Sequence, residues 1–365
     1  MRKKGFLGFS DLVRKKRSLL NGPIILLTLL ILFILAPLFS SELRPATDQT
    51  SSANIVNVPR IERLKGQVEL VSRQVKGVVG VAIKHLETGE AMAVRGDEPF
   101  PMASVFKIPI LVEVMAQIKE GRFQLDDMWP LSPLDLHLGS GLLSSLQAPG
   151  IALSVRNIIY LMMLISDNSA TDLLLRKVGT EKVNERIRSL GVEGITVNRS
   201  CQELILEYRG VDPNRYKNLT LEEIEKLFLQ ERTTNPQAWE QARQNFSQVM
   251  KDQSTPLAMN RLLELIATRQ ILDQESCDFI IEVMLRCQTG ERRLKGDLPP
   301  GVRVAHKTGT IGGTVNDVGI IFLPYDQGRV AITVFIKNAD EEKTEDVEEV
   351  IAQIARFAYD YFLFR

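Results

Sequence analysis

Three short polar segments constrain the fold of this chain more than any other feature. In chain order they are Ser104-Val-Phe-Lys107, Ser166-Asp-Asn168 and Lys307-Thr-Gly309-Thr310. With average residue usage, the first pattern is expected about once by chance in a chain of this length, whereas each of the others is expected roughly once per several thousand residues. Because they contain hydroxyl, ammonium and amide groups that can act together, we expect the fold to bring all three into one cleft.

Ser104 and Lys107 are the pair best suited to nucleophilic chemistry. Residues three apart share one face of a helix, so the amine can reach the hydroxyl, although the same spacing alone is typical of an exposed helix turn. An amine that burial or neighbouring positive charge keeps neutral can accept the serine proton. The start of a helix also favours negative charge at the serine. The pair therefore predicts a covalent acyl-serine mechanism that needs no histidine.

The other two segments fall in different local structures. Ser166-Asp-Asn168 lies in the break between two helical stretches, where a polar triplet can also serve as a helix cap. Lys307-Thr-Gly309-Thr310 lies on a predicted strand, on which Lys307 and Gly309 face one way and Thr308 the other. A glycine in a strand lets a second backbone approach closely. Both segments can therefore form walls of a cleft.

Composition disfavours several other functions. Lys and Arg total 45, as do Asp and Glu, so the chain has no net charge that would attract nucleic acid. The scattered histidines and the odd number of cysteines show no zinc-like or Ser-His-Asp pattern. We interpret the three histidines, His85, His137 and His306, as structural or surface residues. The three cysteines are interpreted as buried apolar side chains: Cys201, Cys277 and Cys287. The sequence predicts no metal and no cofactor.

The spacing of apolar residues predicts an α+β domain over residues 60–365. Helices are expected at 60–75, from about 103, at 155–165, 170–178, from 180 to about 191, and at 341–362; strands are expected at 77–86, 91–94, 302–310, 317–323 and 329–336. Ser154 and Ser169 are suited to cap the third and fourth of these helices. One antiparallel sheet built from both chain ends, flanked by the terminal helices, would then surround an all-helical insert.

The first sixty residues have a different character. Basic residues within 1–18 precede an apolar run within 19–39, which is enough for one tilted membrane crossing with a cytoplasmic N-terminus. A cleaved signal peptide has similar features, but no small-x-small cleavage site follows, so an uncleaved anchor is preferred. Residues 40–59 have the composition of a flexible linker. The domain would lie outside the cytoplasm, in the periplasm or at the cell surface.

In their surroundings, the three segments resemble those of class A β-lactamases and penicillin-binding proteins. The similar stretches are Phe100 to Lys107, Leu164 to Thr171 and Val304 to Gly313, and the resemblance covers about residues 60–363. It implies the β-lactamase/transpeptidase-like fold and a serine acyl-hydrolase, with Ser104 as nucleophile and Lys107 as general base.

The resemblance implies further roles near the second segment. Ser166 would pass a proton to the leaving nitrogen, Asn168 would bind the substrate amide, and Asp167 would hold the loop. The family places a cleft-lining loop where this chain has Gly139-Ser-Gly141, although a simple turn is an equally good interpretation.

For the third segment, the resemblance implies a substrate-binding strand. Lys307 would supply positive potential, and the Thr308 and Thr310 hydroxyls would hold the substrate carboxylate, with Gly309 between them. The backbone amides of Ser104 and Thr310 would form the oxyanion hole, whose individual donors are each worth about two to three powers of ten in rate.

One part of the class A pattern is incomplete. Those enzymes activate the deacylating water with a glutamate in a Glu-x-x-Leu-Asn setting. Here Glu203 and Glu207 are present, but no Leu-Asn follows either of them. Glu203 is the candidate base; otherwise it is a solvated helix carboxylate. The Thr-Pro helix start that the family implies comes at Thr255, only after an extra segment at about 211–253.

These features predict a membrane-tethered serine hydrolase that is acylated by β-lactams and hydrolyses their ring. One alternative is a D-alanyl-D-alanine carboxypeptidase or transpeptidase that acts on peptidoglycan stem peptides and is blocked by β-lactams. A second alternative is a catalytically silent, membrane-anchored protein that binds peptidoglycan, with the extra segment as its partner surface.

Overall fold

The computed structural model describes residues 60–364, and the account that follows concerns that part of the chain. The anchor or signal sequence expected at 19–39 and the linker expected at 40–59 lie outside the described residues. Within the described part, no helix combines the length and the apolar character needed to cross a membrane.

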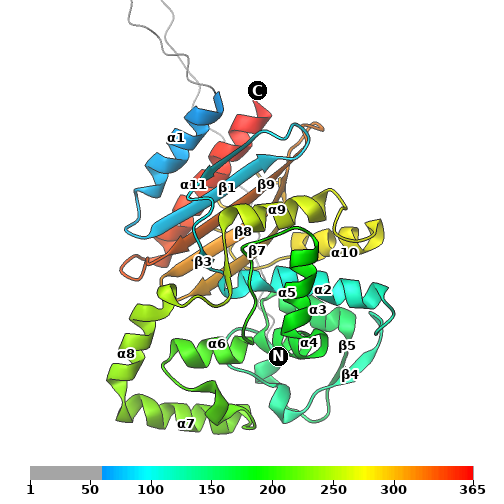
Figure 1. Ribbon diagram of the computed structural model, residues 1–365, viewed down its shortest axis with the longest axis vertical. Helices are drawn as coiled ribbons and strands as arrows, with labels where there is room; N and C mark the ends of the chain where they lie inside the picture. Colours follow the sequence, from blue (N-terminus) through cyan, green and yellow to red (C-terminus); the bar gives the residue numbers. More distant parts are fainter. Residues whose placement is uncertain (1–59, 365) are drawn as a thin grey trace, which may run out of the picture. The chain divides into compact units, whose positions relative to one another are not determined.

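A five-stranded antiparallel sheet is made from both ends of the domain, as the sequence predicts (Figure 1). Its strands, in spatial order, are β2 (Ala91–Val94), β1 (Val78–His85), β9 (Arg329–Lys337), β8 (Thr314–Phe322) and β7 (Arg303–Ile311). The N-terminal hairpin joins the C-terminal meander through β1 and β9, where Val81 lies opposite Val334. Along β9, Val334 and Ile336 pack on one face of the sheet and Phe335 on the other, as strand alternation requires.

The two terminal helices cover one face of this sheet (Figure 1). They are α1 (Arg60–Ser72) and α11 (Thr344–Leu363). Leu64 and Val68 of α1 and Ile351 of α11 are fully buried in the core under the sheet. Burial of such side chains contributes about 1.5–3 kcal/mol each, so this layer ties the two chain ends together.

Helices also cover the opposite face and extend beyond it into a helical region. Nearest the sheet are α9 (Pro256–Ala267) and α10 (Gln274–Leu285). In the helical region, the residues of α2 (Lys107–Lys119) from Lys107 to Gln117 are all buried. The other elements are α3 (Val155–Leu164), α4 (Asn168–Val178), α5 (Thr180–Ser189), α6 (Cys201–Tyr208), α7 (Leu221–Thr234) and α8 (Pro236–Asn245), the 3₁₀ turns η1 (Ala103–Phe106), η2 (Pro133–Asp135), η3 (Leu143–Ser145), η4 (Pro213–Tyr216) and η5 (Phe246–Gln248), and the short strand pairs β3 (Phe100–Pro101) with β6 (Gln253–Ser254) and β4 (Met128–Pro130) with β5 (Ala152–Ser154). Helix α2 packs on α4, α5 and α10.

Two helix starts test the capping predictions. Ser154 caps α3, as expected, by accepting a hydrogen bond from the Asn157 N–H. The cap of α4 is Asp167 rather than Ser169: Asp167 Oδ1 accepts from the Ala170 N–H at 2.9 Å, whereas Ser169 Oγ accepts from the His137 N–H. The Ser169 hydroxyl is occupied by this contact with His137, and a carboxylate at position 167 also gains from the helix dipole.

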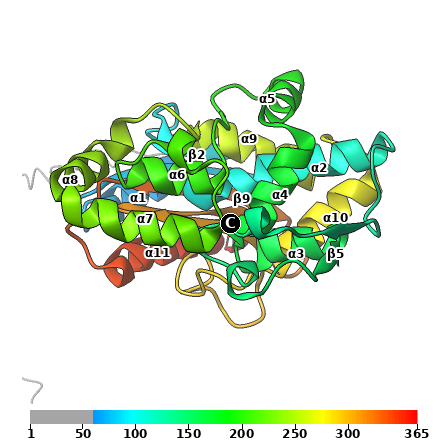
Figure 2. The same cartoon turned by 90° about the horizontal axis from the view of Figure 1, so that it is seen from below.

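Residues 198–252, which include α6 and most of the extra segment, form an arm whose two ends are joined by hydrogen bonds, here called the neck. Arg199 Nε donates to Asp252 Oδ2 at 2.5 Å, and Asp252 Oδ1 accepts from the Asn198 N–H at 2.6 Å. Between these ends the chain runs through α6, α7 and α8, and Figures 1 and 2 show α7 and α8 at the periphery with α6 on their inner side. Phe228 and Tyr216 belong to a small separate core within the arm.

Candidate active site

Ser104 lies in the 3₁₀ turn that leads into α2 and is partly exposed. The turn is held against the sheet by Asn316 of β8, whose Nδ2 donates to the Met102 carbonyl oxygen at 3.0 Å. Gly309 of β7 lies even closer, because a Cβ atom there would come within 2.4 Å of the Met102 carbonyl oxygen and 3.1 Å of the Ser104 nitrogen. Only glycine permits this approach, as the sequence predicts. Ala103 adopts a positive φ of 46°, which places local strain beside the serine.

Two buried ammonium groups meet at Ser166. Lys107 Nζ donates to the Ser166 carbonyl oxygen at 2.7 Å, to Ser166 Oγ at 3.0 Å and to Asn168 Oδ1 at 3.0 Å. Lys307 Nζ donates to Ser166 Oγ at 3.1 Å and to the Thr308 carbonyl oxygen at 2.9 Å. Both lysines are fully buried, and Ser166 has a φ of 60°. The structure therefore brings residues of all three polar segments into contact.

Burial lowers the pKa of both amines. For Lys107 this outweighs the nearby Cys201 and Asp172, which act in the opposite direction. For Lys307 burial, assisted by the charge of Lys107, lowers the pKa to about 8. Two ammonium groups that share one hydroxyl repel each other, so removing one proton from the pair is favoured. The site can therefore supply a neutral amine as a base at near-neutral pH.

The Ser166-Asp-Asn168 segment is fastened to the loop at 138–143. Asp167 Oδ2 accepts hydrogen bonds from the Leu142 and Leu143 N–H groups at 2.6 and 2.9 Å. Asn168 donates through its backbone N–H to the Ser140 carbonyl oxygen at 2.9 Å. A Cβ atom on Gly141 would lie 2.3 Å from Asp167 Oδ2, so this contact also requires glycine. The loop is thus part of the site rather than a simple turn.

A cavity of about 250 Å³ lies between these elements and α6. Ser104, Ser140, Asn168 and Thr310 contribute polar groups to one side of it. The roof comes from α6 and the residue that follows it: Cys201, Leu204, Ile205, Tyr208 and Arg209. The partly exposed Ser104 hydroxyl therefore opens into a space large enough for a small organic substrate.

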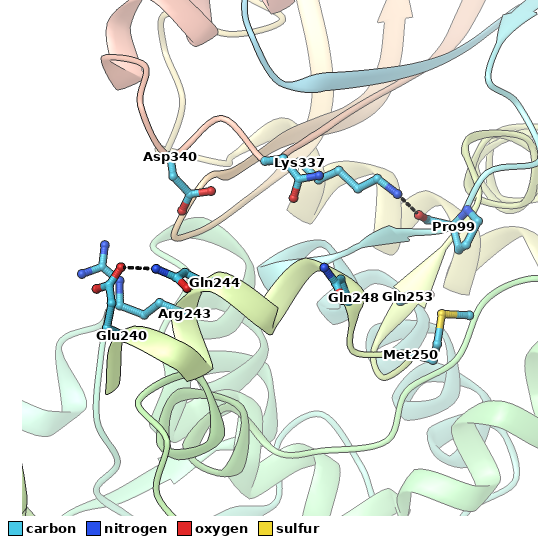
Figure 3. A pocket seen from close by; sticks show the side chains of 10 residues that line it. Pro99, Glu240, Arg243, Gln244, Gln248, Met250, Gln253, Lys337 and Asp340 are labelled. Carbon is cyan, nitrogen blue, oxygen red and sulfur yellow. Dashed lines mark hydrogen bonds between the residues drawn. The ribbon is translucent and has the colours of Figure 1, made fainter. Parts of the chain in front are cut away.

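A larger cavity, of about 600 Å³, lies between α8 and the chain that follows β9 (Figure 3). Its lining is mostly polar and includes Arg243, Gln244, Gln248, Lys337 and Asp340. It contains no residue of the three polar segments. The larger cavity is therefore not the reactive site. We assign that site to the smaller cavity, because buried amines, hydroxyl groups and close backbone contacts meet there.

The family described as Beta-lactamase enzyme family matches residues 63–362 of this chain. The chain belongs to this family. It is 29% identical to β-lactamase VEB-1 of Pseudomonas aeruginosa over 314 residues, which cover 83% of this chain and 91% of that protein. It is 28% identical to the extended-spectrum β-lactamase PER-1 of the same organism over 309 residues, covering 82% and 87%.

Solved structures agree with this assignment. TLA-1 extended-spectrum β-lactamase superposes with a TM-score of 0.67 at 28% identity, covering 84% of this chain and all of that one. A point mutant of PBP-A, solved as an acyl-enzyme complex with penicillin-G, gives 0.64 at 25% identity, covering 83% and 96%. The chain is a class A β-lactamase-like serine hydrolase, and the fold that the resemblance implies is confirmed.

Glu203, the residue nearest in sequence to the family's deacylating glutamate, does not line the cavity. It is exposed, and its Oε2 accepts from the Ser200 N–H at 2.8 Å while Ser200 Oγ accepts from the Glu203 N–H. This capping box holds the carboxylate at the outer start of α6. Glu207 is likewise occupied, by Arg199 and Lys251. The helix instead presents Cys201 to the cavity.

Thr308 also lies away from the cavity. Its Oγ1 is 2.6 Å from Thr289 Oγ1, on the opposite face of β7 from Lys307 and Gly309. The direct cause is strand alternation, which sends neighbouring side chains to opposite faces. The hydroxyl that the resemblance assigned to carboxylate binding therefore contacts Thr289 rather than the cavity. Thr310 shares the face of Thr308 by alternation, and its Oγ1 accepts from Arg293 Nη2 at 2.8 Å, but near the end of β7 it is exposed and lines the cavity.

Several supporting residues escaped the sequence reasoning. Arg293 Nη1 donates to the Asn316 carbonyl oxygen at 2.8 Å and its Nε to Glu348, which fixes the end of β7. Asn316 lies opposite Gly309 in the sheet register, a relation that becomes visible only once β7 and β8 are paired. Arg209 follows an apolar helix and gave no signal of its own.

The predictions for the histidines and cysteines largely hold. All three cysteines are free and buried. His306 is fully buried with Nδ1 2.9 Å from Asp317 Oδ1, and although burial opposes protonation, this carboxylate raises the pKa of His306 to about 9. His85 is buried and contacts the Gln327 carbonyl oxygen, and His137 contacts Asp172. These residues support the fold around the site.

Proposed function

We propose that this protein is acylated by β-lactams at Ser104 and hydrolyses the β-lactam ring. The observation that carries this proposal is that Ser104 and Asn168 line the same cavity. Asn168 Oδ1 also accepts a hydrogen bond from Lys107, which shares Ser166 Oγ with Lys307. The family membership and the named β-lactamase relatives support it.

In the proposed mechanism, Lys107 in its neutral form accepts the Ser104 proton while Ser104 Oγ bonds to the substrate carbonyl carbon. Breaking of the carbon–nitrogen bond is completed when Ser166 Oγ delivers a proton to the leaving nitrogen and is reprotonated by Lys107. The contacts of Lys107 Nζ with Ser166 support this relay. Because the two lysines share one hydroxyl, loss of one proton from the pair costs little.

Stabilisation of the intermediate is assigned to backbone and cationic groups. We propose that the N–H groups of Ser104 and Thr310 bind the oxyanion, since the turn and strand that carry them are in contact through Gly309. Lys307 supplies positive potential, and Thr310 with Lys307 takes the substrate carboxylate. Asn168 binds the substrate amide from the other wall of the cavity.

A second candidate function has an observation in its favour. In the part of the chain that the structure describes, no Asp or Glu side chain lines the cavity that contains Ser104. Without a placed carboxylate to activate water, an acyl-enzyme persists, and the protein would act as a penicillin-binding protein on D-alanyl-D-alanine stem peptides. The rate of acyl release distinguishes the two functions.

The test is the time course with a chromogenic cephalosporin, comparing the wild type with Ser104→Ala. Repeated turnover by the wild type alone supports the hydrolase. One stoichiometric burst followed by a stable adduct indicates the penicillin-binding alternative. No burst and no adduct, with circular dichroism showing an intact fold, would favour the silent peptidoglycan binder and refute both acylating functions.

We further propose that residues 19–39 anchor the protein in a membrane with the catalytic domain outside the cytoplasm. The support is the basic flank followed by an apolar run. Cell fractionation of the full chain and of a variant lacking residues 1–39 tests this. The full chain should sediment with membranes and be degraded by protease added to spheroplasts; full-length protein that is soluble, or shielded from protease, contradicts the proposal.

A further inference from the structure

Arg209 lines the cavity that contains Ser104, and its charge is not matched by an acidic side chain in the described part of the chain. It follows the last residue of α6 and is partly buried. Within residues 60–364, no carboxylate forms an ion pair with it, and the charged groups that influence its pKa are Tyr208 and another cation, Arg232. The two acids closest along α6 are occupied elsewhere: Glu203 in its capping box and Glu207 with Arg199 and Lys251.

The arm holds this guanidinium in place through aromatic rings. The Arg209 guanidinium carbon lies 4.3 Å from the centroid of the Phe228 ring of α7 and 5.8 Å from that of Trp239 of α8. The two rings meet edge to face at 5.0 Å. Arg232 stacks on Trp239 at 5.5 Å. Such contacts orient a cation without neutralising it, because a ring face carries no net charge.

The result is a preorganised positive charge at the roof of the cavity. Burial lowers the pKa of Arg209, and among residues 60–364 no carboxylate offsets this effect. An anion bound in the cavity that Arg209 lines would supply the negative partner that the guanidinium lacks there. The arm that supplies both rings thus has a direct effect on the chemistry of the cavity.

We propose that Arg209 is a specificity-determining residue that binds a second anionic group of the substrate, carried on its acyl side chain. This inference rests on the proposed function. In the proposed mechanism, Ser166 and Lys307 interact with the leaving nitrogen of the substrate and with the carboxylate next to that nitrogen. The roof beyond Thr310, where Tyr208 lies against Gly312, is then left for the acyl side chain. Arg209 is part of this roof.

The test compares two penicillins that differ only in a carboxylate on the acyl side chain, carbenicillin and benzylpenicillin. The quantity measured is the second-order rate constant for acylation, for the wild type, Arg209→Met, Arg209→Lys and a control, Lys226→Met. Lys226 is an exposed cation on α7 and is absent from the cavity, so the control removes the same charge from the same arm.

The preference is the acylation rate constant for carbenicillin divided by that for benzylpenicillin. It should be above one in the wild type and in the Lys226 variant, and roughly tenfold smaller in Arg209→Met, which corresponds to the loss of one hydrogen-bonded charge pair. Arg209→Lys should keep part of it, and added salt should weaken it in the wild type. Acylation by benzylpenicillin should stay near the wild-type value in Arg209→Met. An equal effect of that substitution on both penicillins, or no wild-type preference, overturns the inference.

A binding experiment separates this inference from the proposed function. Calorimetry with the Ser104→Gly variant measures the affinity for both penicillins without acylation. If the wild type is never acylated but Ser104→Gly binds carbenicillin more tightly in an Arg209-dependent manner, the proposed function fails and the anion site stands. If the wild type is acylated but the affinity of Ser104→Gly for carbenicillin does not exceed that for benzylpenicillin, the proposed function stands and the anion site is refuted.

Discussion

At Ser166, one hydroxyl oxygen accepts hydrogen bonds from two buried lysines, Lys107 and Lys307. A serine hydroxyl can accept two hydrogen bonds and donate one. The two lysines use both acceptor positions of Ser166 Oγ, so its own proton is free to be donated to a third group, such as the leaving nitrogen of the substrate. The positive φ of Ser166 holds this arrangement at some cost in backbone strain. Such strain is expected where a side chain must be aimed rather than merely packed.

The lowered pKa of Lys307 leads to a pH prediction. Its proposed role requires the protonated form, which is lost as the pH rises through about 8. The acylation rate constant of the wild type should therefore fall above this pH. Lys307→Arg should be slower overall but lack that fall, because arginine stays charged. Stopped-flow acylation by benzylpenicillin measures both profiles; a wild-type profile that is flat through this range contradicts the assignment.

Cys201 marks the place where a deacylating carboxylate could act. It is buried and lines the cavity with Ser104. Cys201→Glu should accelerate release of the acyl group by about tenfold or more, since a positioned base activates water. Cys201→Gln, of similar size and uncharged, should not. Decay of the penicillin adduct followed by mass spectrometry checks this, and equal decay in the two variants would refute it.

Among the elements, α6 has the most influence on the site, because it covers the cavity that contains Ser104 and is also part of the arm. Asp172 of α4 holds its start: Oδ1 accepts from the Cys201 N–H at 2.6 Å and Oδ2 from the Gln202 N–H at 3.0 Å. The neck between Arg199 and Asp252 holds the base of the arm. The roof is therefore fixed independently from two sides.

The neck gives a stability prediction. Arg199 and Asp252 are 4% and 1% exposed, so Asp252→Ala leaves the buried guanidinium with Glu207 as its remaining acidic partner and removes the acceptor of two backbone N–H groups. Unfolding in urea should show a loss of roughly 3–5 kcal/mol. The control Asp126→Ala removes the surface pair with Arg156 and should cost no more than about 1 kcal/mol. Equal losses in the two variants would mean that the neck does not stabilise the fold.

The arm also links elements to specificity. Trp239 of α8 contributes one of the two rings beside Arg209 and stacks on Arg232 as well. Trp239→Leu keeps an apolar side chain but removes the ring face, so the carbenicillin preference should shrink while acylation by benzylpenicillin continues. The same rate constants measure this. An unchanged preference would show that Phe228 alone positions the guanidinium.

Over the whole molecule, the sheet and the convergence of the motifs could be predicted because both follow from local patterns. Runs rich in β-branched and apolar residues, divided by glycines and a turn, mark β7, β8 and β9, and the three polar segments need each other chemically. The position of Glu203 could not be predicted in this way. Ser200 and Glu203 form a capping box whose pattern is visible in the sequence, but whether the carboxylate caps the helix or faces the cavity depends on how α6 is seated.

Two other differences have equally local causes. Asp167 and Ser169 are both good cap residues, and only the contacts with the loop at 138–143 and with His137 decide between them. For Thr308, strand alternation correctly indicated the far face, while the family resemblance assigned its hydroxyl to the substrate. Arg209 depends on rings from α7 and α8 that are distant in sequence, so no local pattern could reveal it.

The central claim is that Ser104 is acylated in the cavity beneath α6. Mass spectrometry of the wild type after exposure to benzylpenicillin, with peptide mapping of the adduct, tests it most directly. We predict one penicilloyl group per protein, located on Ser104 and absent from Ser104→Ala. A folded wild type with unshifted mass, or an adduct that persists in Ser104→Ala, would contradict the account.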